Sequence, residues 1–128
     1  MGISVWAGLA NIGTITGNTI GSITGAGSIM VTDYYNSTNG SVVGIHATSA
    51  YALNIMNNNI GSISTDGANI TGIYVGNGYG NTNVSNNLIG STEDATTNSL
   101  IVQNPTSPYA KSVCGICLYS SGLKTINN

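Results

Sequence analysis

Residues 58–62 read Asn-Asn-Ile-Gly-Ser, and the chain repeats this pattern at two other places. Asn-x-Ile-Gly-Ser also occurs at 18–22 and at 87–91. A second signature, Gly-Ile-x-apolar, begins at Gly2, Gly44, Gly72 and Gly115. Since the two signatures alternate along the chain, they belong to one repeating unit. The 128 residues therefore form an array in which each copy buries its apolar face against its neighbours.

The apolar runs of this unit have the period of β-strands. In residues 43–47, Val43, Ile45 and Ala47 share one face, and Gly44 and His46 share the other. Successive units carry their strands in the same order and sense, so we expect like strands to stack in parallel. Two or three short strands per unit, joined by tight turns and stacked in this way, form a parallel β-helix.

Recurring isoleucines mark the predicted core. Two inward columns are expected: one contains Ile3, Ile45, Ile73 and Ile116, and the other contains Ile20, Ile60 and Ile89. Each of the first three copies has a further apolar residue three positions before its repeated Asn: Ile15, Ile55 and Val84. Ile126 holds the equivalent position in the fourth copy.

The repeated asparagines Asn18, Asn58 and Asn87 have a structural interpretation. Asparagine tolerates left-handed backbone angles, and its amide carries both a donor and an acceptor. Stacked about 4.8 Å apart at a bend between strands, such amides can bond to one another along the array. The same offset in three copies predicts a structural Asn ladder.

Two sequence patterns resemble known repeats. Gly-Ile-x-Val at 72–75, followed by Val-Ser-Asn-Asn-x-Ile at 84–89, resembles the repeat of right-handed parallel β-helix proteins. The Asn-x-Ile-Gly-Ser variant resembles repeat segments of long cell-surface proteins of Bacteroidetes-type bacteria. The resemblance implies an all-β, right-handed solenoid of about four rungs, and a secreted or cell-surface location. It specifies fold rather than activity, because lyases, hydrolases, phage tailspikes and adhesins share this repeat.

The spacing of the units predicts the domain organisation. Residues 1–128 are expected to form one solenoid segment of a longer array, with rungs starting near Gly2, Gly44, Gly72 and Gly115. Extra residues fall at about 23–43 and 92–114, as two insertions on one face. Insertions at one position of a solenoid often form its binding face. For the apolar runs inside them, at 28–31 and 99–102, we favour pairing as an additional strand or packing over the coil.

Composition excludes several classes of protein. Charged residues make up 5% of the chain, hydrophobic residues 41%, and the net charge is −2. Disordered chains combine low hydrophobicity with high charge, which is the opposite balance. The chain has no arginine and only two lysines, so we expect no nucleic-acid partner. No apolar run approaches the roughly 20 residues of a membrane helix, and the N-terminus lacks the pattern of a signal peptide.

Residues with catalytic or metal-binding chemistry are few. The acids are Asp33, Asp66, Glu93 and Asp94. They show no clear pairing of the kind that glycoside hydrolysis requires. We therefore expect no catalytic, cofactor or metal site and no enzymatic activity.

Cys114 and Cys117 have the spacing of a redox motif, but they fall in an expected strand. There their Cα atoms would lie about 10 Å apart, beyond the roughly 7 Å that a disulfide spans. Cys114 is expected to point inward and Cys117 outward, so two free thiols are predicted.

Three functional classes remain. The leading hypothesis is a structural or adhesive segment that contacts a glycan or another protein through an uncharged face. The candidate contact residues on that face are His46, Tyr74, Tyr34, Tyr35 and Tyr109. The alternatives are a non-catalytic fragment of a carbohydrate-active enzyme and an ice-binding solenoid, although only residues 14–16 read Thr-x-Thr. Open terminal rungs also predict end-to-end self-association or continuation into further rungs.

Overall fold

The computed structural model describes residues 1–22, 28–32, 40–48, 51–90, 99–103 and 111–127. These residues form an all-β structure of fourteen strands. In chain order the strands are β1 (Ile3–Val5), β2 (Ala10–Ile12), β3 (Thr19–Ile20), β4 (Ile29–Thr32), β5 (Ser41–Thr48), β6 (Leu53–Met56), β7 (Asn59–Ile60), β8 (Ile63–Asp66), β9 (Asn69–Gly76), β10 (Thr82–Ser85), β11 (Leu88–Ile89), β12 (Leu100–Gln103), β13 (Val113–Leu118) and β14 (Lys124–Asn127). Within the described ranges, no helix is long and apolar enough to cross a membrane.

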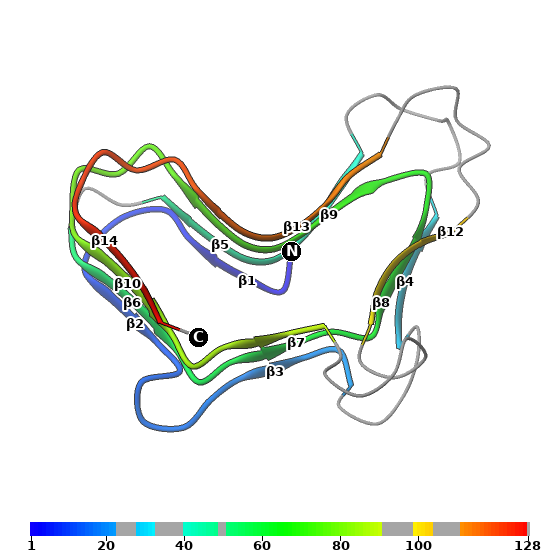
Figure 1. Ribbon diagram of the computed structural model, residues 1–128, viewed down its shortest axis with the longest axis horizontal. Helices are drawn as coiled ribbons and strands as arrows, with labels where there is room; N and C mark the ends of the chain where they lie inside the picture. Colours follow the sequence, from blue (N-terminus) through cyan, green and yellow to red (C-terminus); the bar gives the residue numbers. More distant parts are fainter. Residues whose placement is uncertain (23–27, 33–39, 49–50, 91–98, 104–110, 128) are drawn as a thin grey trace.

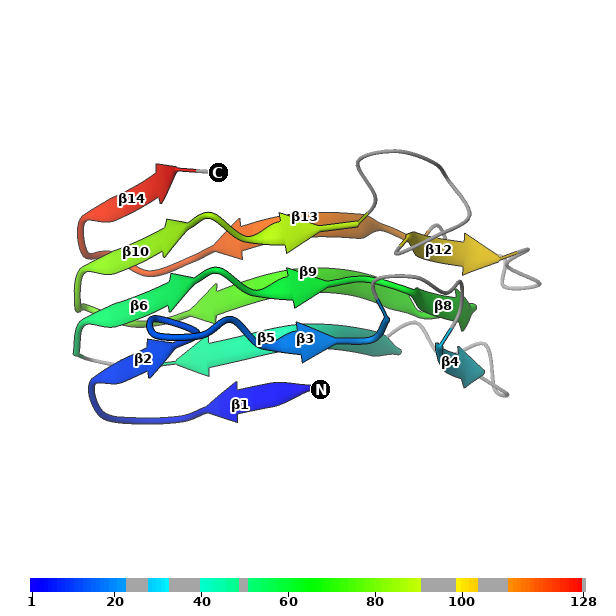
Figure 2. The ribbon, with the colours of Figure 1, turned by 90° about the horizontal axis from the view of Figure 1, so that it is seen from below.

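The strands form four parallel sheets, which the chain visits in a fixed order. Sheet A contains β1, β5, β9 and β13; sheet B contains β2, β6, β10 and β14; sheet C contains β3, β7 and β11; sheet D contains β4, β8 and β12. One passage through the sheets is called a coil here, so β1–β4 form coil 1, β5–β8 coil 2, β9–β12 coil 3, and β13 and β14 coil 4. Figure 1 shows the outline of the coils, and Figure 2 shows them stacked. The predicted all-β class with parallel strands is confirmed, with four sheets where two or three strands per unit were expected.

The repeated isoleucines lie in register from coil to coil. Ile45 pairs with Ile3 on one side and with Ile73 on the other. Ile60 likewise lies between Ile20 and Ile89. Ile45, Ile60 and Ile73 are all 0% exposed, because a coil covers them on each side. The core is therefore continuous along the stack, as an array of units that bury one another requires.

Coil 1 departs from the predicted pattern at Ile15, which is 95% exposed. The residue that pairs with Ile55 is Ile12, three positions earlier. Between Ile12 and Asn18 the chain makes a longer turn, in which Gly13 takes a left-handed φ of 76°. The prediction for Ile15 was wrong because counting back from the repeated Asn assumes that every turn has the same length.

Asn18, Asn58 and Asn87 form a hydrogen-bonded stack. The Nδ2 atom of Asn18 donates to Oδ1 of Asn58 at 2.8 Å, and Nδ2 of Asn58 donates to Oδ1 of Asn87 at 2.8 Å. The backbone N–H groups of Asn18 and Asn58 donate to the same two oxygens. Asn58 is 1% exposed and Asn87 7%. The left-handed backbone lies one residue earlier than expected, at Asn57 and Asn86, with φ of 58° and 54°.

The apolar runs at 28–31 and 99–102 contribute strands to the coils. β4 pairs with β8 from Ile29↔Ile63 to Thr32↔Asp66, and β12 pairs with the other edge of β8. The two segments expected to be insertions thus hold the fourth strand of coils 1 and 3. In coil 2 the same path is shorter, because only two residues separate β7 from β8 and two separate β8 from β9.

Glycines of the Gly-Ile signature allow sheet A to bend toward sheet C. A Cβ atom on Gly44 would lie 2.6 Å from Cγ2 of Ile60, and one on Gly72 would lie 2.6 Å from Cγ2 of Ile89. Any larger residue at these positions would push the two sheets apart. The strands of sheet A accordingly curve toward β3 and β7, which makes the outer face of sheet A concave (Figure 1).

We predict that Gly72→Ala destabilises the chain. The added Cβ would lie 2.6 Å from the carbonyl oxygen of Gly115 as well as close to Ile89. Relieving these contacts should cost about 1–3 kcal/mol of unfolding free energy. Gly115→Ala is the matched control, because nothing lies within 4 Å of a Cβ at that position. Urea unfolding checks the pair, and equal midpoints for the two variants would contradict the close packing of sheets A and C.

Candidate functional site

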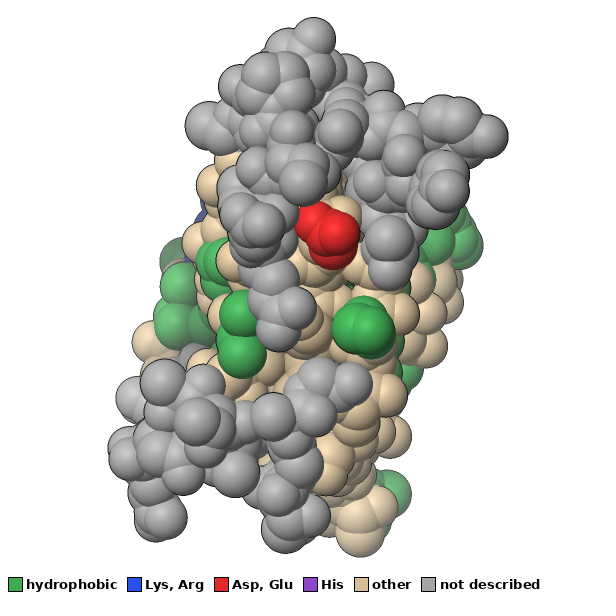
Figure 3. Space-filling model, turned by 90° about the vertical axis from the view of Figure 1, so that its right-hand side faces the viewer, with side chains coloured by type: hydrophobic (Ala, Val, Ile, Leu, Met, Phe, Trp, Pro, Cys, Tyr) green, Lys and Arg blue, Asp and Glu red, His purple; other side chains and the backbone are tan. Residues whose placement is uncertain are grey.

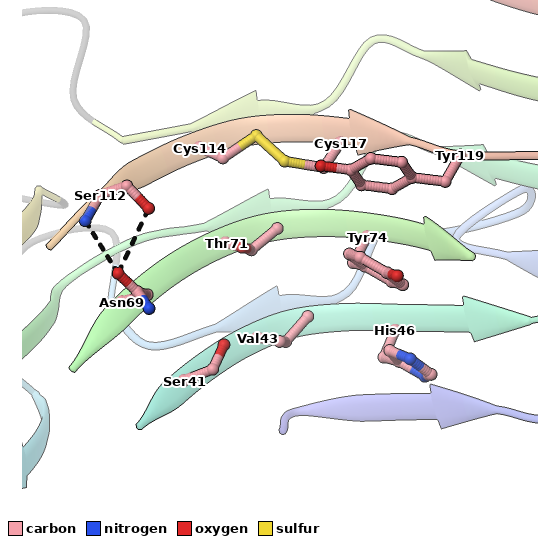
Figure 4. A pocket seen from close by; sticks show the side chains of 10 residues that line it. All are labelled: Ser41, Val43, His46, Asn69, Thr71, Tyr74, Ser112, Cys114, Cys117 and Tyr119. Carbon is pink, nitrogen blue, oxygen red and sulfur yellow. Dashed lines mark hydrogen bonds between the residues drawn. A yellow bond between two sulfur atoms is a disulfide. The ribbon is translucent and has the colours of Figure 1, made fainter. Parts of the chain in front are cut away.

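The concave outer face of sheet A forms a groove with a volume of about 590 Å³. This volume falls within the roughly 300–1,000 Å³ typical of ligand sites. Figure 4 shows the side chains that line the groove: Ser41, Val43, His46, Asn69, Thr71, Tyr74, Ser112, Cys114, Cys117 and Tyr119. They come from β5, β9 and β13 and from the residues next to β13.

The stacking of the coils arranges these side chains in columns. Thr71 lies between Val43 and Cys114, and Tyr74 lies between His46 and Cys117. Thr71 and Tyr74 are both half-buried and face the groove, while Gly72 and Ile73 between them are buried. The bend thus places two consecutive residues on the core side and brings residues three apart to the same outer face. This local break in alternation creates the groove.

One wall of the groove is a row of aromatic rings. The His46 and Tyr74 rings are stacked, with centroids 5.2 Å apart and planes 4° apart. Trp6 continues the row beyond His46 at 4.9 Å, and Tyr119 continues it beyond Tyr74 at 5.4 Å. Trp6 is 67% exposed and Tyr119 64%. The two middle rings cover each other, so the free ring surface lies at the ends of the row.

The opposite wall is polar. Oδ1 of Asn69 accepts hydrogen bonds from the backbone N–H of Ser112 at 2.9 Å and from its hydroxyl at 3.3 Å. Ser41 lies beside Asn69 on the next coil. The Thr71 side chain stands between this wall and the aromatic row (Figure 4). Near the aromatic row, Nδ1 of His46 is buried and has no hydrogen-bond partner among the described residues. The groove therefore offers hydrogen-bonding groups beside aromatic surface.

Cys114 and Cys117 form a disulfide, which corrects the prediction of two free thiols. Their Cα atoms are 6.4 Å apart, whereas a straight strand would hold them about 10 Å apart. The bend at Gly115 and Ile116 shortens the distance and turns Cys114 outward, so both side chains line the groove. The expectation that Cys114 points inward was wrong for the same reason.

Charged side chains are absent from the ten residues that line the groove. In the described ranges, the one acid, Asp66, belongs to β8 in sheet D, and Lys124 belongs to β14 in sheet B. Lys111 precedes the groove residue Ser112 but is not itself part of the lining. Figure 3 views the sheet D side, where a small acidic area lies among apolar and uncharged groups. The groove lining therefore contains no Asp, Glu, Lys or Arg side chain that could pair with a charged ligand.

Two of the five predicted contact residues, His46 and Tyr74, meet in the groove. Tyr34, Tyr35 and Tyr109 lie outside the described residues, as do Asp33, Glu93 and Asp94. Sequence reasoning missed Trp6 and Tyr119, which occupy the position directly after β1 and β13. Their equivalent place after the Gly-Ile-x-apolar signature is the signal that could have found them.

In the part of the chain that the structure describes, no three His, Cys, Asp or Glu side chains are grouped so that they could hold a metal ion. Comparison of the chain with protein-family models, with curated proteins and with solved structures gave no match.

Proposed function

We propose that this chain is a segment of a right-handed parallel β-helix with a structural and adhesive role, and that the groove of sheet A binds a glycan. The fixed order of four parallel sheets supports the β-helix, and the sequence resemblance supports its hand. By that resemblance, the parent protein is a secreted or cell-surface repeat protein of the Bacteroidetes type.

The observation that carries the glycan proposal is the pairing of aromatic rings with uncharged hydrogen-bonding groups across one groove. A sugar ring presents C–H groups on its faces and hydroxyls around its rim. Aromatic surface accommodates the apolar faces, while Ser, Thr and Asn side chains bond to hydroxyls both as donors and as acceptors. Ligand sites of this kind combine apolar lining with a few placed polar groups.

We predict that Tyr74→Ala weakens glycan binding about tenfold or more, because Tyr74 lines the groove and lies between His46 and Tyr119 in the aromatic row. A glycan array identifies a ligand, and calorimetry on the full chain compares the variants. Tyr79→Ala is the control, since Tyr79 is 80% exposed and does not line the groove.

Equal losses in the two tyrosine variants would contradict the groove as the binding site, and an array without any bound glycan would contradict the proposal itself. The bound polysaccharides are also incubated with the chain and assayed for new reducing ends. Shortened products would show that the chain is a carbohydrate-active enzyme instead.

A further inference from the structure

We infer that the groove takes an uncharged polysaccharide, lying along the stack of coils, and that it discriminates against acidic polysaccharides. This inference rests on the proposed glycan binding and names the class and direction of the ligand. Three observations carry it: the charge of the lining, the repetition of the lining from coil to coil, and the position of the groove within the sheet.

The lining offers nothing to neutralise a charged sugar. Its polar groups are hydroxyls of Ser41, Thr71 and Ser112, the amide of Asn69, and the rings of the aromatic row. A carboxylate moved from water into such a groove loses hydration without gaining a cationic partner. The chain's net charge of −2 adds weak repulsion of any polyanion. Hydroxyls of a neutral sugar meet no such penalty.

The lining also repeats along the stack. Coils 2, 3 and 4 each contribute one polar residue to the far wall, in the order Ser41, Asn69 and Ser112, and one ring to the aromatic row, in the order His46, Tyr74 and Tyr119. Adjacent parallel strands lie about 4.8 Å apart, so similar groups recur at that interval. A polymer of similar neutral units meets similar contacts at each step, whereas a peptide presents a different side chain each time.

The position of the groove argues against a peptide bound as an added strand. That mode of binding needs a free strand edge. The groove instead lies on the outer face of β5, β9 and β13, away from the edge of β13 where the sheet ends. A ligand in the groove therefore crosses the strands and runs from coil to coil.

The test measures binding of the full chain to matched soluble polymers by calorimetry. Mixed-linkage β-glucan, galactomannan and arabinogalactan are the neutral probes, and polygalacturonate and alginate are the acidic ones, at low and at physiological ionic strength. We expect at least one neutral polymer to bind about tenfold more tightly than either acidic polymer. Oligosaccharides of increasing length from that polymer should gain affinity until they span the coils of the groove.

Variants at Thr71, the residue at the centre of the groove, connect this preference to the site. Thr71→Asp should weaken binding of the neutral polymer about tenfold or more, and Thr71→Lys should strengthen binding of polygalacturonate by a similar factor. Thr19→Asp is the matched control, because Thr19 is exposed on β3 in sheet C. Circular dichroism verifies that all three variants remain folded.

The outcomes distinguish failure of this inference from failure of the proposed glycan binding. If an acidic polymer binds the wild type as tightly as any neutral one, at a site sensitive to Thr71, the inference fails and the glycan proposal stands. If a monosaccharide binds as tightly as a long oligosaccharide, the direction along the stack is wrong. If the chain binds no polysaccharide, or binds peptides alone, both claims fail together.

Discussion

We expect the replacement of Ile60 with aspartate to unfold the chain. Ile60 is 0% exposed, it lies between Ile20 and Ile89 in sheet C, and its Cγ2 atom would be 2.6 Å from a Cβ on Gly44. A carboxylate there would be buried without a partner, in a space that cannot expand without separating sheets A and C. The expected loss exceeds about 4 kcal/mol, a large part of the stability of a typical domain. Circular dichroism and urea unfolding measure it.

Thr19→Asp is the control for this prediction, because it introduces the same charge in the same sheet. Thr19 pairs with Asn59, the residue before Ile60, and its side chain is exposed. We expect it to change stability by less than about 0.5 kcal/mol. An Ile60→Asp variant that keeps the β-type spectrum and the unfolding midpoint of the wild type would contradict the buried column.

Replacing Asn58 with alanine has the second largest expected effect. Its Nδ2 atom donates to Oδ1 of Asn87 at 2.8 Å and to the carbonyl oxygen of Ile12 at 3.2 Å. Its Oδ1 atom accepts from Nδ2 and from the backbone N–H of Asn18, at 2.8 and 3.2 Å. The substitution removes the acceptor of both Asn18 N–H groups and one donor to Asn87 and to Ile12, at a site that is 1% exposed. The expected cost is about 3 kcal/mol or more, read from urea unfolding.

Asn77→Ala separates this effect from a general cost of removing asparagine. Asn77 is exposed in the turn between β9 and β10 and has no place in the stack of amides. We expect the unfolding free energy of the Asn77→Ala variant to stay within about 0.5 kcal/mol of that of the wild type. Equal destabilisation by the two substitutions would mean that the repeated asparagines have no special structural role.

The sequence predicts those features of the fold that depend on repetition. An offset that recurs in several copies can be aligned without knowing the path of the chain, so the parallel stacking of like strands followed from the signatures alone. The offset that singles out Asn18, Asn58 and Asn87 corresponds to a continuous stack of amides in the structure. Repetition is informative because each copy occupies the same environment as its neighbours.

The errors arise where a local feature interrupts the repeat. Ile15 was placed by counting from Asn18, but the turn that contains Gly13 is longer than its counterparts. Strict alternation predicted that Cys114 points inward, but the bend at Gly115 places it on the same face as Cys117. A two-residue period assumes a straight strand, and sequence alone does not show which glycine bends one.

The candidate site was predictable only in part for the same reason. The column of His46 and Tyr74 follows from the register. The groove depends on the bend at Gly44 and Gly72, which turns Thr71 outward together with Tyr74. Trp6 and Tyr119 complete the aromatic row from outside the strands, where alternation gives no guidance. The concavity of sheet A is thus a property of packing against sheet C.

Contacts between isoleucine methyl groups would show in solution whether the chain forms parallel coils stacked in register. Nuclear Overhauser spectra of a chain with selectively labelled isoleucine methyls would identify neighbours in solution. We expect contacts of Ile60 with Ile20 and Ile89, and of Ile45 with Ile3 and Ile73. Parallel coils would be ruled out if these contacts were absent. The spectrum would then show methyl contacts between consecutive segments, of the kind that antiparallel hairpins form.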